Sequence, residues 1–210
     1  MDPEASRIRP YRPGDLDDLY RICLLTSDGG QDGTASYPDD PELPGHVHAA
    51  PYGLFEPSLA FVAVTADGVG GYVIGALDTR AFAERLERDW WPALRKRYPE
   101  PPPEARGQPR TPPQRMAYQI HHPWTAPQEL TRQYPSHLHI NLVPRLQGRG
   151  HGRQLIETLL TALRAQGSPG VHLFVGHGNE RAPGFYRRVG FTELPSADTH
   201  IFTMDLRGAA

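Results

Sequence analysis

Three alternating glycines just before a helical pattern are the clearest chemical signal in this chain. They lie in the segment Gln147-Gly148-Arg149-Gly150-His151-Gly152, which Arg153 follows. Apolar residues then recur at helical spacing, namely Leu155, Ile156, Leu159, Leu160 and Leu163. Backbone N–H groups at a helix N-terminus have no partner within the helix, and the helix dipole favours an anion there. Because glycines let a bulky anion approach and the arginines add positive charge, we predict a cradle for a phosphate or pyrophosphate.

Other kinds of loop also use glycine in this way. A tight strand-to-helix turn needs the glycines but not the basic neighbours, and it stays open as the alternative. A dinucleotide-binding fingerprint needs an acidic residue about 20 residues beyond the loop, after a second strand. Here the apolar run 171–175 leads instead into Gly176-His177-Gly178, and the Gly-Lys-Ser/Thr of a Walker loop is absent.

The segment before the loop carries polar groups that could move a proton. Its alternation predicts a strand over His137–Val143, with His137, His139 and Asn141 on one face and apolar residues on the other. Pro144 ends the strand. A histidine has a near-neutral pKa and could act as a base for an amine, whereas the alternative is a structural hydrogen bond on a buried strand. With no third ligand at hand, the two histidines do not predict a metal site.

Composition limits the class of protein. The 210 residues carry a net charge of −2, which argues against binding to nucleic acid or to an anionic membrane. Cys23 is the only cysteine, so neither an intrachain disulfide nor a cysteine metal cluster is expected. The N-terminus has no apolar signal region, and no stretch is long and apolar enough to cross a bilayer. We therefore expect a cytoplasmic protein whose single domain spans residues 6–207.

The first part of the chain predicts a strand, a helix and a hairpin. The strand covers 8–11, the helix runs from Leu16 to about Leu25 with Asp15 as its cap, and the hairpin strands are 59–65 and 69–77. A loop rich in Gly, Asp and Pro is expected over 27–57. Its Asp28 and Asp32 could line an acceptor site for a basic group, or simply be solvated.

Residues 80–134 form an insertion before the central strand. We expect a helix over 80–98 capped by Thr79 and kinked or split at Pro92, a proline-rich segment over 99–113, a strand over 116–122 and a helix over 127–133. Trp90 and Trp91 could hold a sugar or peptide, or pack on the sheet and the insertion.

Beyond the glycine loop, strands and helices alternate. Gly167 is expected to cap the central helix, followed by a strand over 171–175, a helix over 181–188 and strands over 191–194 and 200–206. This order predicts an α/β fold with a mixed sheet.

Two motifs together resemble the GNAT acyltransferases. The first is Gln147-x-x-Gly150-x-Gly152 after a strand; the second is Asn179-x-x-Ala182-x-x-Phe185-Tyr186-x-x-x-Gly190-Phe191. More narrowly, Tyr134-Pro135-Ser136-His137-Leu138-His139-Ile140 and the proline-rich insertion look like the acetyltransferase-like domain of O-GlcNAc hydrolases and its free-standing bacterial relatives. The resemblance implies a GNAT fold, an α/β architecture whose mixed, mostly antiparallel sheet is splayed between strands 4 and 5, flanked by helices, with the large insertion before strand 4.

The resemblance also implies acetyl-CoA as the ligand. Its pyrophosphate would lie on the loop formed by Gln147, Gly148, Arg149, Gly150, His151 and Gly152, beside Arg153. Its pantetheine would run along the central strand and bond to the backbone of Leu142 and Val143. Asn179, Ala182, Phe185 and Tyr186 would contact the ligand from the second motif, and Tyr186 would protonate the departing thiolate. Without the resemblance, Tyr186 would be read as a core aromatic.

One departure from the family pattern puts catalysis in question. Many GNAT enzymes place a carboxylate base on the central strand, where this chain has Asn141, which cannot take a proton. Asp78 is another candidate base, or else a helix cap. If His139 relays the proton instead, the rate should rise through about pH 6–7. The sequence thus predicts transfer of an acetyl group to a small-molecule or peptide amine, with Tyr186, His139 and Asn141 at the centre; the alternative is an inactive acetyl-CoA-binding or protein-interaction module.

Overall fold

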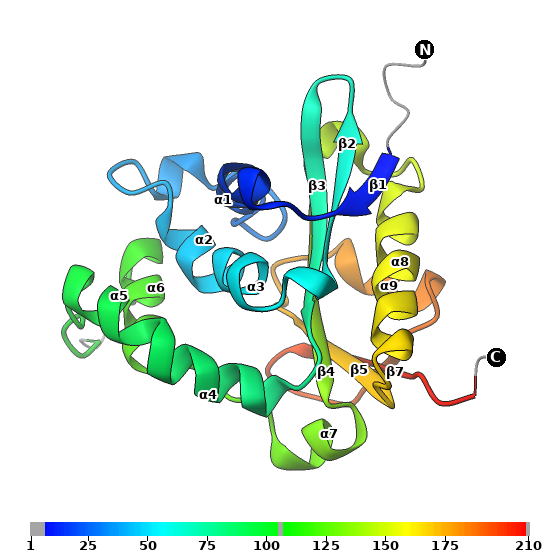
Figure 1. Ribbon diagram of the computed structural model, residues 1–210. Helices are drawn as coiled ribbons and strands as arrows, with labels where there is room; N and C mark the ends of the chain where they lie inside the picture. Colours follow the sequence, from blue (N-terminus) through cyan, green and yellow to red (C-terminus); the bar gives the residue numbers. More distant parts are fainter. Residues whose placement is uncertain (1–6, 105–106, 209–210) are drawn as a thin grey trace.

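The chain forms one seven-stranded sheet with helices on both faces (Figure 1). The computed structural model describes residues 7–104 and 107–208. The strand order is β1-β2-β3-β4-β5-β7-β6, and each neighbouring pair is antiparallel except β4 and β5. The strands are β1 Arg7–Pro10, β2 Ala60–Thr65, β3 Gly68–Ala76, β4 Ser136–Leu142, β5 Gly170–Val175, β6 Thr192–Leu194 and β7 His200–Asp205. The expected α/β architecture with a mixed, mostly antiparallel sheet is confirmed.

The parallel pair β4–β5 separates almost at once. Its register holds only Ser136 with Val171 and His137 with His172. Beyond His137, β4 stays paired to β3 as far as Leu142, while β5 diverges from β4 and keeps its pairing with β7 as far as Val175. The expected splay between strands 4 and 5 is therefore present, and it leaves one edge of β4 open along residues 138–142.

Helices α1 (Leu16–Leu24) and α8 (His151–Ala165) lie on opposite faces of this sheet (Figure 1). The alternation along β4 decides which residue meets which helix. Leu138 belongs to the apolar cluster that contains Leu155 and Leu159 of α8, whereas His137 and His139 face the layer that contains α3. The expected two-faced strand is confirmed.

The predicted long loop over 27–57 is wrong in its second half. Two short helices, α2 (Leu43–His48) and α3 (Ala50–Phe55), fill it, each with a proline in its first turn. Their buried Val47 and Tyr52 pack into the same apolar cluster as α1 and β3. Helices of this length show too few turns for a periodic pattern, so tertiary burial decides their structure.

The regular elements of the insertion are helices in the part that the structure describes, joined by irregular segments. It contains α4 (Thr79–Asp89), α5 (Trp91–Arg97), α6 (Pro112–His121) and α7 (Gln128–Gln133). The predicted strand over 116–122 is wrong, because Thr111 and Gln114 form a capping box that starts α6, and Ile120 is buried in the core. The break that was expected near Pro92 falls at Trp90, between α4 and α5.

Two capping assignments also change. Asp78, not Thr79, caps α4, since its carboxylate accepts from the N–H groups of Arg80 (2.9 Å) and Ala81 (3.0 Å). Asp15 makes no cap to α1; its carboxylate pairs with the Arg9 guanidinium at 2.6 Å, which lowers the pKa of Asp15.

Trp90 and Trp91 both pack against the apolar core. Trp91 is buried in the cluster with α3 and β3, and Trp90 packs against that cluster while its Nε1 donates to the carbonyl of His46 at 2.9 Å. The remaining elements are α9 (Ala182–Arg188) and the short 3-10 turns Pro13–Asp15, Thr34–Ser36, Pro57–Leu59 and Pro144–Leu146. None of the described helices has the length and apolar character needed to span a membrane.

Candidate active site

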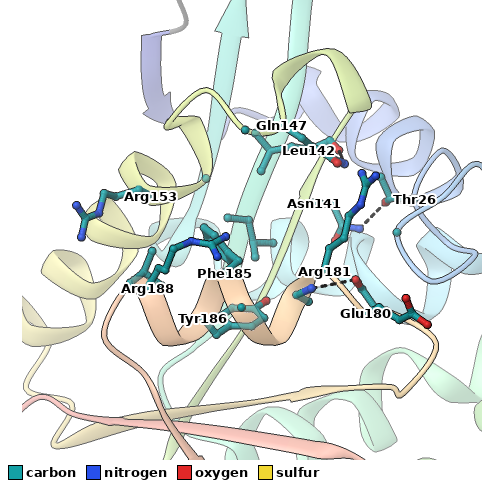
Figure 2. A pocket seen from close by; sticks show the side chains of 18 of the residues that line it. Thr26, Asn141, Leu142, Gln147, Arg153, Glu180, Arg181, Phe185, Tyr186 and Arg188 are labelled. Atoms are coloured by element: carbon teal, nitrogen blue, oxygen red, sulfur yellow. Dashed lines mark hydrogen bonds between the residues drawn. The ribbon is translucent and has the colours of Figure 1, made fainter.

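A cleft of about 1010 Å³ opens where β4 and β5 separate (Figure 2). Four segments form its walls: the end of β4, the glycine loop with the start of α8, helix α9, and the loop after α1. A smaller cavity of about 630 Å³ continues from it and shares Asn141, Asn179 and Tyr186 with it. We call the first the main cleft and the second the acceptor-side cavity, which His139, Arg115 and Phe174 also line.

The glycine loop has the backbone that a phosphate cradle needs. Gly148 (φ +73°) and Gly150 (φ +90°) are both in the left-handed region, and both line the main cleft. Gly150 is the N-cap of the 15-residue helix α8, so the N–H groups of the first turn point out of the helix at this end. A Cβ added at Gly150 would meet no protein atom within 4 Å, which leaves that space to a ligand.

The third glycine has a different role. A Cβ at Gly152 would lie 3.2 Å from the ring of Phe185, so this glycine lets α9 pack closely against the start of α8. Phe185 itself lines the main cleft, as expected.

The backbone groups of β4 that face the cleft belong to Leu142, one of the two residues predicted, and to Ile140 in place of Val143. The N–H of Val143 donates to the carbonyl of Gly70 (2.9 Å) and its carbonyl accepts from the N–H of Leu146 (2.9 Å), so both groups of Val143 are already bonded within the protein. Backbone hydrogen bonding alternates along the antiparallel pair β3–β4. The backbone N–H and C=O groups of Ile140 and Leu142 therefore point away from β3, toward the gap beside β5. A hydrogen bond from Gln147 supports this orientation, because its Nε2 donates to the carbonyl of Leu142 at 2.9 Å.

The positive charge at the cleft comes from three arginines near the starts of α8 and α9 and the end of α9. Arg153, Arg181 and Arg188 all line the main cleft. Figure 2 shows Arg188 reaching over the cleft and Arg153 extending away from it, and Arg153 Nε lies 3.4 Å from a carboxylate oxygen of Glu157. Arg149 is exposed and His151 is buried, and neither is among the residues that line the main cleft. Arg181 and Arg188 were not predicted as site residues, although their spacing of seven places both on one face of the helix expected over 181–188.

Asn179 and Tyr186 stand where the second motif predicted. Asn179 Oδ1 accepts from the N–H of Ala182 at 3.2 Å and so starts α9, and Asn179, Ala182 and Tyr186 line both cavities. Tyr186 is 6% exposed, and burial raises its pKa, which keeps the phenol protonated throughout the physiological range.

Asn141 is held by Thr26, which lies just after α1. Its Nδ2 donates to the hydroxyl oxygen of Thr26, whose own proton goes to the carbonyl of Ile22 at 2.7 Å. A carboxylate at position 141 would therefore face an oxygen with no proton to give. This pairing explains why an amide suits the position.

The two histidines of β4 share one partner, the buried Tyr52 of α3. Its hydroxyl lies 2.8 Å from His137 Nε2 and 3.0 Å from His139 Nε2. His139 is half-buried, and burial lowers the pKa of its imidazole to about 3. The predicted rise in rate through pH 6–7 therefore has no basis in His139.

The other acidic candidates do not reach the site. Asp78 is a helix cap, and the carboxylate of Asp32 folds back onto the N–H (2.9 Å) and hydroxyl (2.6 Å) of Thr34. Neither Asp28 nor Asp32 is among the residues that line the two cavities. No carboxylate is present among the residues that line the acceptor-side cavity.

The loop after α1 contributes backbone instead. Gly29 and Gly30 line both cavities, and they lie against the β5–α9 loop: a Cβ at Gly29 would be 2.8 Å from the carbonyl of Gly178. The two glycines were visible in the sequence, but nothing local showed which loop they meet. Within the described part of the chain, no three His, Cys, Asp or Glu residues are grouped as metal ligands.

Comparison with known proteins agrees with this geometry. The model of the acetyltransferase (GNAT) family matches residues 83–191. The chain is 25% identical to protein O-GlcNAcase of Rattus norvegicus over 190 residues, which are 89% of this chain and 20% of that protein, so it spans about a fifth of the length of this curated relative.

Solved structures extend the similarity over the whole fold. The crystal structure of SsHAT has a TM-score of 0.84 and 36% identity, covering 96% of this chain and 98% of that one. The putative acetyltransferase yncA from Salmonella typhimurium, solved with its cofactor acetyl-CoA, has a TM-score of 0.58 at 14% identity and covers 98% of this chain and 97% of that one. At that identity the second match shows a shared fold.

Proposed function

The chain belongs to the GNAT acetyltransferase family, and we propose that it transfers the acetyl group of acetyl-CoA to the nitrogen of an amine. The observation that carries this proposal is the continuous cleft that joins a phosphate cradle at one end to a protected polar pocket at the other. An acyl thioester with a distant pyrophosphate is a substrate of this shape and charge.

The substrate would be held by backbone and by charge. The N–H groups of the glycine loop and of the first turn of α8 would bind the pyrophosphate, with Arg188 and Arg181 as counter-charges. The pantetheine amides would pair with the open edge of β4 at Ile140 and Leu142, as an added strand does. This pairing would bring the thioester to the point where β4 and β5 separate, between β4 and Tyr186.

The chemistry needs a proton to leave the amine and a proton to reach the thiolate. As the amine nitrogen bonds to the acetyl carbon, the N–H of Leu142 or Ile140 would stabilise the charge that develops on the carbonyl oxygen. Tyr186 keeps its proton at working pH because burial raises its pKa, so it can donate to the sulfur as the C–S bond breaks. His139 is the base that the geometry favours, since Asn141 cannot accept the proton.

The acceptor should carry few positive charges. Arg115 is the one charged side chain among the residues that line the acceptor-side cavity. A lysine-rich peptide would therefore meet no complementary charge there, whereas a neutral or anionic amine would not be repelled.

Release of the coenzyme thiol from acetyl-CoA tests the proposal directly, with a panel of neutral, anionic and cationic amines, peptides and amino sugars as acceptors. We expect turnover of at least one neutral or anionic amine, and His139→Ala should slow it by roughly 10²-fold while acetyl-CoA affinity stays nearly unchanged. Equal losses of binding and rate would make His139 a structural residue.

A second function, binding of acetyl-CoA without turnover, is favoured by the tie between Asn141 and Thr26. If no amine is acetylated although acetyl-CoA binds, Asn141→Asp becomes the informative variant. It restores a carboxylate only if the Thr26 hydroxyl turns away from the Ile22 carbonyl to donate to it. A gain of turnover in that variant would identify the chain as a GNAT scaffold without its base.

A further inference from the structure

A chain of four polar side chains runs behind the cleft from the start of α4 to β4. It begins at Thr79, whose hydroxyl lies 2.7 Å from the carbonyl of Pro135 and 2.7 Å from His137 Nδ1. A hydroxyl has one proton, and a carbonyl oxygen can only accept, so the proton of Thr79 goes to Pro135. Toward His137 the Thr79 oxygen is therefore an acceptor, and His137 Nδ1 must carry a hydrogen.

The direction of this first bond fixes each of the others. Burial lowers the pKa of His137 well below its usual range, so the ring is neutral and its Nε2 holds a lone pair. The Tyr52 hydroxyl, 2.8 Å away, donates to that lone pair. The Tyr52 oxygen then accepts from His139 Nε2 at 3.0 Å, which places the hydrogen of His139 on Nε2. The network thus assigns both tautomers.

The remaining nitrogen of His139 faces the acceptor-side cavity. Its Nδ1 has no hydrogen-bond partner among the described residues, it is not among the buried unpaired atoms, and His139 lines that cavity. Tyr52 is rigidly placed, since it is 6% exposed and its ring lies 4.6 Å from that of Phe82. The lone pair of His139 is therefore directed at the acceptor by a residue that itself lies outside the cavity.

We propose that Tyr52 is a positioning residue that holds His139 in the tautomer with its Nδ1 lone pair open to the amine acceptor. This assignment rests on the proposed function. In the reaction, the N–C bond forms and the C–S bond breaks, the amine proton moves to His139 Nδ1, and the coenzyme thiolate takes its proton from Tyr186. The proton on His139 then returns through solvent to the Tyr186 oxygen, so that both groups are restored.

The environment decides when His139 accepts the proton. No carboxylate lies beside its ring among the residues that line the cavity, so the imidazolium gains no ion pair. The free enzyme keeps His139 neutral, and the ring takes a proton only once the bonding nitrogen has become acidic. A fixed lone pair matters most under these conditions, because a ring that turned its N–H toward the amine could not act at all.

The test combines kinetics with a direct reading of the tautomer. Tyr52→Phe keeps the ring and removes the hydroxyl, while Phe82→Leu disturbs the packing of the same ring without removing a hydrogen bond. We expect Tyr52→Phe to lower kcat roughly 10- to 100-fold with little change in KM for acetyl-CoA, as for other residues that orient a histidine. Phe82→Leu should lower stability and leave kcat within about twofold.

Nitrogen-15 NMR of the histidine rings supplies the second readout. In the wild type, His139 should show the hydrogen on Nε2, and in Tyr52→Phe the two tautomers should mix. A wild-type His139 with its hydrogen on Nδ1, or a Tyr52→Phe variant with unchanged kcat and unchanged tautomer, would overturn the assignment. If the wild type turns over no amine, the proposed function fails and the catalytic role of Tyr52 with it, whereas the NMR result still decides whether the hydrogen-bond chain is present.

Discussion

Replacing Gly150 separates the conformational need of the glycine loop from its contact with the ligand. Gly150 has φ +90°, and a Cβ there would point into space that no protein atom occupies. Gly68, the first residue of β3, matches it closely, with φ +98° and equally open surroundings, and it does not line either cavity. Gly150→Val and Gly68→Val should therefore carry similar backbone strain but differ in their effect on acetyl-CoA.

The expected sizes follow from the backbone and from ligand linkage. A non-glycine residue in this region costs about 1–3 kcal/mol, and for a domain of this length about 1 kcal/mol corresponds to roughly 2–4 °C in Tm. Each variant without ligand should therefore melt roughly 2–12 °C below the wild type. Acetyl-CoA at about 100 times its Kd should stabilise the wild type by about 2.7 kcal/mol, which is roughly 5–11 °C.

Thermal-shift measurements with and without acetyl-CoA check this comparison. Gly68→Val should keep the full ligand-induced shift, and Gly150→Val should lose it, because its side chain fills the cradle or its backbone relaxes and turns the N–H groups away. Titration calorimetry at 25 °C measures the acetyl-CoA affinity of the same variants without thermal unfolding. A Gly150→Val variant that still shifts as much as Gly68→Val would refute the phosphate cradle at this loop.

The remaining predictions concern charge, pH and domain structure. Arg188→Ala should weaken acetyl-CoA binding about tenfold and reduce its salt dependence, whereas Arg187→Ala should not, since Arg187 pairs with Glu193 at 2.5 Å; calorimetry at two salt concentrations distinguishes them. Burial lowers the pKa of His139 to about 3 and of His48 to about 4, so the unfolded chain binds more protons between these values and about 6.5. The free energy of unfolding should therefore fall as the pH drops from about 6.5 toward 4, by at most about 1.4 kcal/mol per pH unit for each such histidine, and His139→Gln should flatten the slope measured by urea unfolding. Limited proteolysis should cut first within 99–113 and leave both fragments associated, because Trp91 and Ile120 share one apolar cluster; fragments that separate without denaturant would contradict a single domain over 6–207.

The parts of the site that the sequence predicted are those with a local physical signature. Left-handed backbone at Gly148 and Gly150 follows from residue type and from the helix that begins beside them. The two faces of β4 follow from strict alternation, and the pair Asn179 and Tyr186 follows from a fixed spacing on one short helix. In each case the deciding interaction joins residues that are near in sequence.

The predictions that failed lacked such a signature. Helices α2 and α3, with six residues each, are too short to show a periodic pattern, and burial against distant elements selects their structure. Helix α6 follows a proline-rich segment, and its capping box rather than its apolar pattern marks its start. The open backbone groups of β4 belong to Ile140 and Leu142 rather than Val143 because the register with β3 decides which residues face the gap.

The sequence alone thus determined the family and the absence of a carboxylate at position 141, and it predicted the phosphate cradle. The tertiary structure decided what surrounds that position. Tyr52 reaches His139 across 87 residues, and Thr26 reaches Asn141 across 115. Such partners leave no periodic trace in the sequence, and the desolvation that lowers the pKa of His139 arises only when these distant segments close around it.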